Sequence, residues 1–175
     1  MQIFLCGGVG GWLYEYMAGI VPTSPGYSTI NVKPHISKTL GPASVSAVVR
    51  TVRGSISSNW TRHTTAAAAS AQDSKGQTVL TLKVQIPAGV ERATVRIPLL
   101  GLAAQGVHLN LVPARLQPTL GTARGTVSTA LWRGGALPES QPSTLACKAV
   151  AGADGEDGLE LTVGPGAFEF VVVPL

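Results

Sequence analysis

Apolar and polar residues alternate along much of this chain with the period of two that is typical of β-strands. The clearest alternation lies in residues 44–49, 56–61, 80–86 and 92–97, with further candidate strands at 27–32, 107–111, 145–150, 159–163 and 167–173. Each clear run has one apolar face, so we expect each strand to cover a core on one side and to meet water on the other. Short strands separated by turn residues favour a mainly β fold, an antiparallel β-sandwich.

Turn residues divide these runs into hairpins. Val52-Arg53-Gly54 separates the runs 44–49 and 56–61, and Pro87 to Val90 separates the runs 80–86 and 92–97. We therefore expect a hairpin at the first position and a turn of the chain at the second. The apolar faces predict a core that includes Ile56, Trp60, Leu82, Val84, Val95, Phe168 and Phe170.

A helical pattern precedes the strands, at residues 8–18. Its apolar positions have helical spacing and are Trp12, Leu13, Tyr16, Met17 and Ile20. Gly19 is suited to the left-handed conformation that ends a helix, and Pro22 prevents continuation. One short helix is not stable alone, so it must pack on this chain or on another domain.

Two stretches lack a clear period. Residues 64–76 are rich in Ala, Ser and Thr, which indicates a flexible hairpin loop or, from the four alanines, a short helix. Residues 113–143 are rich in Pro, Gly, Ala and Thr, and we expect mostly loop there.

Composition supports the β interpretation and excludes several functions. Only 13% of the 175 residues are charged, against about a quarter in average proteins, which disfavours solvent-facing helices. The net charge of +4 comes from dispersed cations, so we expect no nucleic-acid partner. No stretch approaches about 20 uninterrupted apolar residues, so we expect no membrane span. Cys6 and Cys147 are expected to be buried free thiols rather than a disulfide framework, and no compartment is indicated.

Five segments, in order along the chain, follow motifs of one known family. Residues 7–20 follow the pattern G-x-V-x-x-W-L-Y-x-x-x-A-G-I, and Pro25-Gly26-Tyr27 and Pro34 come after it. These segments resemble the last catalytic-domain helix of the bacterial-type α-L-rhamnosidase family and the exit from that domain. Residues 54–60 resemble its hairpin G-x-I-x-S-x-W, residues 84–98 its next hairpin, and residues 163–170 its closing strand. Residues 99–143 fit poorly and are interpreted as a loop-rich insertion.

The resemblance implies a layout and an activity for the full-length family. It implies that residues 1–20 correspond to the last helix of an (α/α)-barrel catalytic domain and residues 21–175 to a C-terminal β-sandwich. The family hydrolyses terminal α-L-rhamnose with inversion, through a carboxylic acid and a carboxylate that activates water. Those acids are expected upstream of this region, and the family's pocket Asn-His corresponds to Gln2 and Ile3 here. The expected partner is therefore a rhamnosidase-type barrel, in the same polypeptide or in another.

The chain's own polar residues do not suggest an active site, a metal site or a cofactor. The carboxylates are Glu15, Asp73, Glu91, Glu139, Asp154, Glu156, Asp157, Glu160 and Glu169. The cluster at 154–158 lacks the ligand spacing of an EF-hand and is better explained as a hairpin turn. His35, His63 and His108 show no metal or triad signature, and the glycines at 7–11 lack the Lys-Ser/Thr of a phosphate loop. Asn59-Trp60-Thr61 is a glycosylation sequon in a predicted strand.

The tryptophans decide between two functions. Trp60 shares the face of Ile56, which indicates core packing, whereas Trp132 is expected in an irregular loop and is the candidate carbohydrate contact. Our main hypothesis is a non-catalytic accessory domain that supports a catalytic barrel. The alternative is a separate carbohydrate-binding or protein-interaction module.

Overall fold

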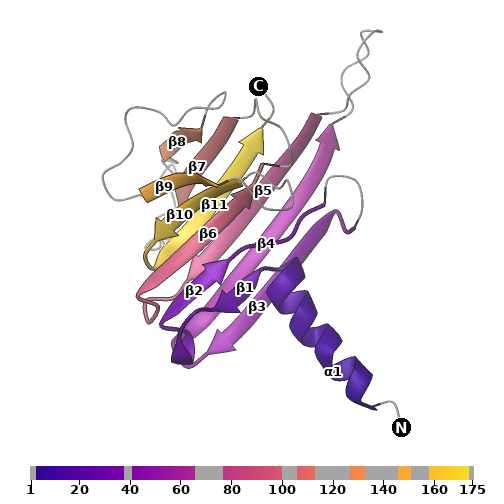
Figure 1. The fold of residues 1–175 in the computed structure, drawn as a ribbon. Coiled ribbons are helices and arrows are strands. Elements are labelled where there is room, and N and C mark those ends of the chain that lie inside the picture. Colours follow the sequence, from indigo (N-terminus) through magenta and orange to yellow (C-terminus); the bar gives the residue numbers. More distant parts are fainter. Residues whose placement is uncertain are drawn as a thin grey trace, which may run out of the picture.

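The strands of the protein form two sheets that enclose one apolar core, as the computed structural model shows (Figure 1). The structure describes residues 3–37, 41–65, 77–99, 106–112, 127–132, 146–150 and 158–173. Within these residues the five-stranded sheet consists, in spatial order, of β1 (Ile20–Pro22), β2 (Thr29–Val32), β6 (Arg92–Pro98), β10 (Gly158–Val163) and β9 (Ala146–Val150). The six-stranded sheet consists of β3 (Ser44–Thr51), β4 (Gly54–Thr65), β5 (Gln77–Ile86), β11 (Gly166–Val173), β7 (Gly106–Val112) and β8 (Val127–Trp132). The mainly β, sandwich-type fold is confirmed.

The predicted core is confirmed almost completely. Of the seven expected residues, all except Phe168 are at most 2% exposed, and Phe168 is half-buried against the same cluster. Trp60 of β4 and Phe170 of β11 both pair with Leu82 of β5, so the largest side chains lie over the middle of the six-stranded sheet. Burying an aromatic side chain removes about 150–250 Å² from water, so these residues dominate the stability of the core.

The hairpin at Val52–Arg53 is confirmed, because β3 and β4 pair from Thr51 and Gly54 outward. The second hairpin, which the family resemblance implies at residues 84–98, is wrong. Pro87 to Val90 carries the chain from β5 in the six-stranded sheet to β6 in the five-stranded sheet. Alternation shows that each strand has one apolar face, but it does not show whether the next strand pairs beside it or lies across the core. β2 also pairs in parallel with β6, which is the exception in a mostly antiparallel arrangement.

The stretch 99–143 contains more regular structure than its composition suggests. The strand expected at residues 107–111 is confirmed as β7. β8 instead lies within residues 113–143, where we expect mostly loop, and the two strands extend the six-stranded sheet beyond β11. Whether this stretch is an insertion stays a prediction. Of the loop or short helix expected at residues 64–76, Thr64 and Thr65 belong to β4, and residues 66–76 lie outside the described residues, as do residues 113–126 and 133–145.

The N-terminal helix consists of α1 (Ile3–Trp12) and the π-helical turn η1 (Leu13–Met17). Gly19 follows with a φ of 76°, which confirms it as the left-handed residue that ends the helix. Ile20 begins β1 instead of continuing the helical face. Ala18 and Ile20 are both buried in the core, so the sandwich includes part of the segment that the expected division at residue 20 assigns to the helix. Among the described residues, no helix has the length and apolarity to cross a membrane.

Candidate functional site

The backbone fastens the end of the helix to the sandwich. The last carbonyls of a helix have no partners within the helix and must find them elsewhere. Here the Tyr16 carbonyl accepts a hydrogen bond from the His35 N–H at 3.0 Å, and the Gly19 carbonyl accepts one from the Lys33 N–H at 2.8 Å. These donors lie just after β2. The close approach requires a glycine, because a β-carbon at position 19 would overlap the backbone of Lys33 and Pro34.

Two side chains of β4 complete this attachment. The Trp60 indole N–H donates to the Met17 carbonyl at 2.9 Å, and the buried Ser58 hydroxyl donates to the Ala18 carbonyl at 2.7 Å. Ser58 is the one fully buried polar residue among those whose burial is described. Such bonds contribute about 0.5–1.5 kcal/mol each, and leaving a buried carbonyl unpaired costs about 1–3 kcal/mol. The sandwich therefore fixes both the end and the direction of the helix.

The helix exposes apolar side chains on the side that we call the apolar helix face. It consists of Val9, Trp12, Leu13 and Tyr16, which are 57%, 50%, 47% and 40% exposed. Their spacing of three and four residues places them on one face of the helix. The Trp12 and Tyr16 rings stack with centroids 5.1 Å apart. In Figure 1 the helix extends away from the sheets, with its N-terminus distant from them.

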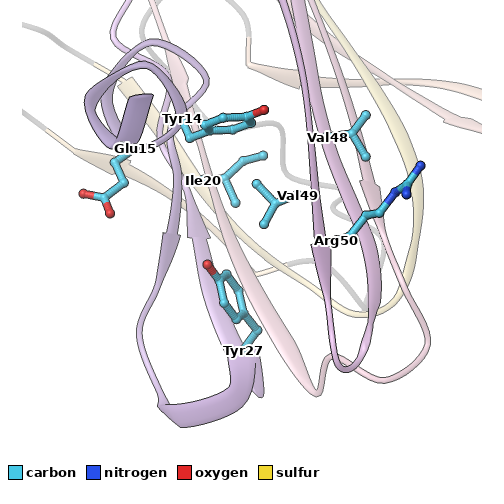
Figure 2. A pocket seen from close by; sticks show the side chains of 8 residues that line it. Tyr14, Glu15, Ile20, Tyr27, Val48, Val49 and Arg50 are labelled. Atoms are coloured by element: carbon cyan, nitrogen blue, oxygen red, sulfur yellow. The ribbon is translucent and has the colours of Figure 1, made fainter. Parts of the chain in front are cut away.

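A groove lies on the other side of the helix, between η1 and β3, and has a volume of about 370 Å³. It is lined by Gly11, Tyr14, Glu15, Ile20, Tyr27, Val48, Val49 and Arg50. Figure 2 shows Tyr14 and Tyr27 on either side of Ile20 and Val49. In the same view the charged ends of Glu15 and Arg50 point away from the centre. The arrangement therefore combines an apolar floor, two phenol groups and one charge of each sign at its rim.

The backbone that positions Tyr27 is unusual. Tyr27 has a φ of 59° at the end of the 3₁₀ turn η2 (Pro25–Tyr27), and Gly26 before it has a φ of 65°. A bulky residue in the left-handed region costs about 1–3 kcal/mol and is found mostly where the surroundings hold it. The Arg53 guanidinium provides such a hold, because it donates to the Gly26 carbonyl at 2.9 Å and to the Gly89 carbonyl at 2.8 Å.

The tryptophans are placed differently from one another. Trp60 is buried as expected, and Trp12 is half exposed on the helix. Trp132 ends strand β8, opposite Val107 of β7, so it does not lie in the irregular loop that we expected. Its side chain lies outside the described part of the structure, and its role as a carbohydrate contact stays a prediction.

The three candidate histidines lie on different parts of the backbone. The rings of His35 and Tyr16 are 4.3 Å apart, whereas His63 is exposed near the end of β4. His108 lies in β7, opposite Val171 of β11. Within the described residues, no group of three or more histidine, cysteine or carboxylate side chains has the arrangement of a metal site.

The carboxylates of the described residues lie on different elements. Glu169 on β11 forms an ion pair with Lys83 at 3.2 Å, and Glu160 on β10 lies between Arg96 and Lys148 in the strand register. Residues 151–157, which include the acidic cluster, lie outside the described residues, although β9 and β10 on either side pair as the expected hairpin requires. Asn59 of the sequon accepts a hydrogen bond from the Ser46 hydroxyl at 2.7 Å.

The fold and the attached helix define a two-sheet β domain that holds a largely uncovered apolar helix at one edge. The family model for the bacterial alpha-L-rhamnosidase C-terminal domain matches residues 19–108, which is just over half of the chain. The chain therefore belongs to the family of bacterial α-L-rhamnosidase C-terminal domains, as the sequence resemblance implied. The matched region begins at Gly19, the residue that ends the helix.

Comparison with solved structures also finds a similar protein. A crystal structure of the Streptomyces avermitilis α-L-rhamnosidase in complex with L-rhamnose has 20% sequence identity and a TM-score of 0.46. The match covers 94% of this chain and 11% of that chain. The chain thus spans a small part of that enzyme's length. Among curated proteins, none matches this chain.

Proposed function

We propose that this chain is a non-catalytic accessory domain that supports the catalytic barrel of a rhamnosidase-type enzyme, in the same polypeptide or as a separate chain. The observation that carries the proposal is the way the helix is held. Its last turn is attached to the sandwich by Trp60, Ser58 and two backbone N–H groups. The same helix exposes Trp12 and Leu13, which are about half exposed.

We expect an uncharged helix with exposed apolar side chains to pack against a partner. The sequence of α1, IFLCGGVGGW, contains no charged residue, and a helix that is apolar all round is normally buried. Large apolar side chains that gather on one surface indicate an interaction site. Membership of the rhamnosidase C-terminal family favours a catalytic barrel as the partner that covers this helix. The sandwich would then hold the helix at a fixed angle for packing among the barrel helices.

Two of the described acids support the non-catalytic part of the proposal. Inverting hydrolysis needs two carboxyl groups about 6.5–9.5 Å apart on opposite sides of the scissile bond. Of the described glutamates, Glu169 is paired with Lys83 and Glu15 points out of the groove. Ile3, which corresponds to the family's pocket histidine, has no side-chain hydrogen-bonding group.

We expect the isolated chain to show no turnover of an aryl α-L-rhamnoside above that of a matched blank. The rhamnoside is the appropriate substrate because the chain matches the family model of the bacterial α-L-rhamnosidase C-terminal domain. The assay uses highly purified protein at high concentration over the range from pH 4 to pH 8. Single replacements of the nine carboxylates with their amides provide the control. Turnover that one such replacement abolishes would show that the domain is itself an enzyme.

A further inference from the structure

The groove and the apolar helix face are two separate surfaces of the same helix. Residues three or four apart share a helix face, whereas residues two apart lie on nearly opposite sides. Tyr14 lies two residues from both Trp12 and Tyr16, and it lines the groove. Figure 2 shows its ring directed over Ile20 and Val49, toward the sandwich. A partner that covers Trp12 and Leu13 would therefore approach from the other side.

The chemistry of the groove fits a neutral ligand with both apolar faces and hydroxyl groups. Ile20 and Val49 provide an apolar floor, and the Tyr14 and Tyr27 rings flank it. A phenol offers an apolar ring face together with a hydroxyl that donates and accepts hydrogen bonds. Glu15 and Arg50 contribute one charge of each sign, so the rim has no net charge to favour a phosphate or a carboxylate.

We propose that this groove is a non-catalytic saccharide-binding site that holds one or two sugar rings. A pyranose ring has an apolar C–H face for a tyrosine ring and equatorial hydroxyls for the phenols. Small-molecule sites usually occupy about 300–1,000 Å³ and combine an apolar lining with a few polar groups. The groove, at about 370 Å³, lies at the lower end of that range, which suits a short saccharide.

The conformation of the groove is fixed before any ligand binds. Tyr27 is fixed in the left-handed conformation, and Arg53 holds the turn before it through the Gly26 carbonyl. Ile20 is buried in the core, and Val49 packs against the core cluster. Strained conformations that the surrounding structure maintains are concentrated at functional sites and ligand clamps. Of the two tyrosines that flank the floor of the groove, Tyr14 lies on the helix and is 46% exposed. Its side chain can therefore be removed without opening the core, which makes it the appropriate position to test.

The test is a titration of the full chain, observed by NMR, with methyl α-L-rhamnoside, methyl α-D-mannoside and cellobiose. We expect at least one sugar to bind with a dissociation constant in the millimolar range, which corresponds to about −4 kcal/mol. Tyr14→Ala should weaken binding by about tenfold or more, because an aromatic anchor contributes most of a small interface. Tyr27→Phe should weaken it by a smaller factor, since the ring stays and only the hydroxyl is lost.

Leu13→Ala is the matched control, because Leu13 is 47% exposed beside Tyr14 at 46% but lies on the apolar helix face. It should leave the affinity unchanged, and equal melting temperatures would show that both variants are folded. The proposal fails if no sugar binds at concentrations up to about 100 mM, far above a millimolar dissociation constant. It also fails if Tyr14→Ala binds like the wild type, or if Trp132→Ala alone abolishes binding. None of these results bears on whether the apolar helix face packs against a barrel.

Discussion

Replacing Gly19 with alanine should lower the free energy of unfolding by more than about 3 kcal/mol, or prevent folding altogether. Two effects add at this position. The φ of 76° is a left-handed conformation that costs an L-residue about 1–2 kcal/mol. The new β-carbon would also overlap the backbone of Lys33 and Pro34, which cannot rotate away as a flexible side chain can. Urea unfolding followed by far-UV circular dichroism measures the change.

Gly10→Ala is the control for this substitution. A β-carbon at Gly10 meets nothing within 4 Å, and the residue lies inside α1. Alanine is favoured over glycine in a helix by about 1 kcal/mol, so this variant should be as stable as the wild type or more stable. If Gly19→Ala were as stable as Gly10→Ala, the attachment of the helix to the sandwich would not be as described.

Replacing Trp60 with alanine should cost about 3–5 kcal/mol. Trp60 is 2% exposed in the middle of the core, so the change removes a large buried surface and leaves a cavity. It also removes the indole N–H that donates to the Met17 carbonyl at 2.9 Å. Chemical unfolding with a probe other than tryptophan fluorescence gives the difference in stability.

Trp60→Phe separates the two contributions. Phenylalanine keeps most of the ring volume but leaves the Met17 carbonyl without this donor, so we expect a loss of about 1–3 kcal/mol. Trp12→Ala is the matched control, because Trp12 is 50% exposed and should contribute little to the stability of the sandwich. A Trp60→Phe variant as stable as the wild type would mean that the indole N–H does not support the helix.

Local pattern predicted the parts of the fold that depend on neighbouring residues. Alternation identified the buried faces of β4, β5, β6 and β11, because apolar and polar residues must alternate in a strand that has one buried and one solvent-facing side. Gly19 could be identified as the end of the helix because glycine enters the left-handed region at little cost. Trp60 could be assigned to the core because it shares a strand face with Ile56.

The parts that local pattern did not predict depend on residues distant in sequence. Ser58 and Trp60 bond to carbonyls 40 and 43 residues earlier in the chain, and nothing near either residue indicates that partner. The sequence does not predict the crossing from β5 in one sheet to β6 in the other, because a short turn can join two strands within a sheet or across the core. The groove was missed for a similar reason, since Tyr14, Tyr27 and Val49 come from three separate elements.

The measurement that most directly tests the accessory-domain account is binding between this chain and a bacterial α-L-rhamnosidase barrel that lacks both its own last helix and its own C-terminal domain. Sedimentation velocity should show a one-to-one complex. The double variant Trp12→Lys with Leu13→Lys should weaken it by at least about tenfold, because charges replace the buried centre of the contact. Tyr14→Ala, on the groove side, should bind the barrel like the wild type. No complex at about 100 µM, or a complex that the double variant does not weaken, would contradict the account.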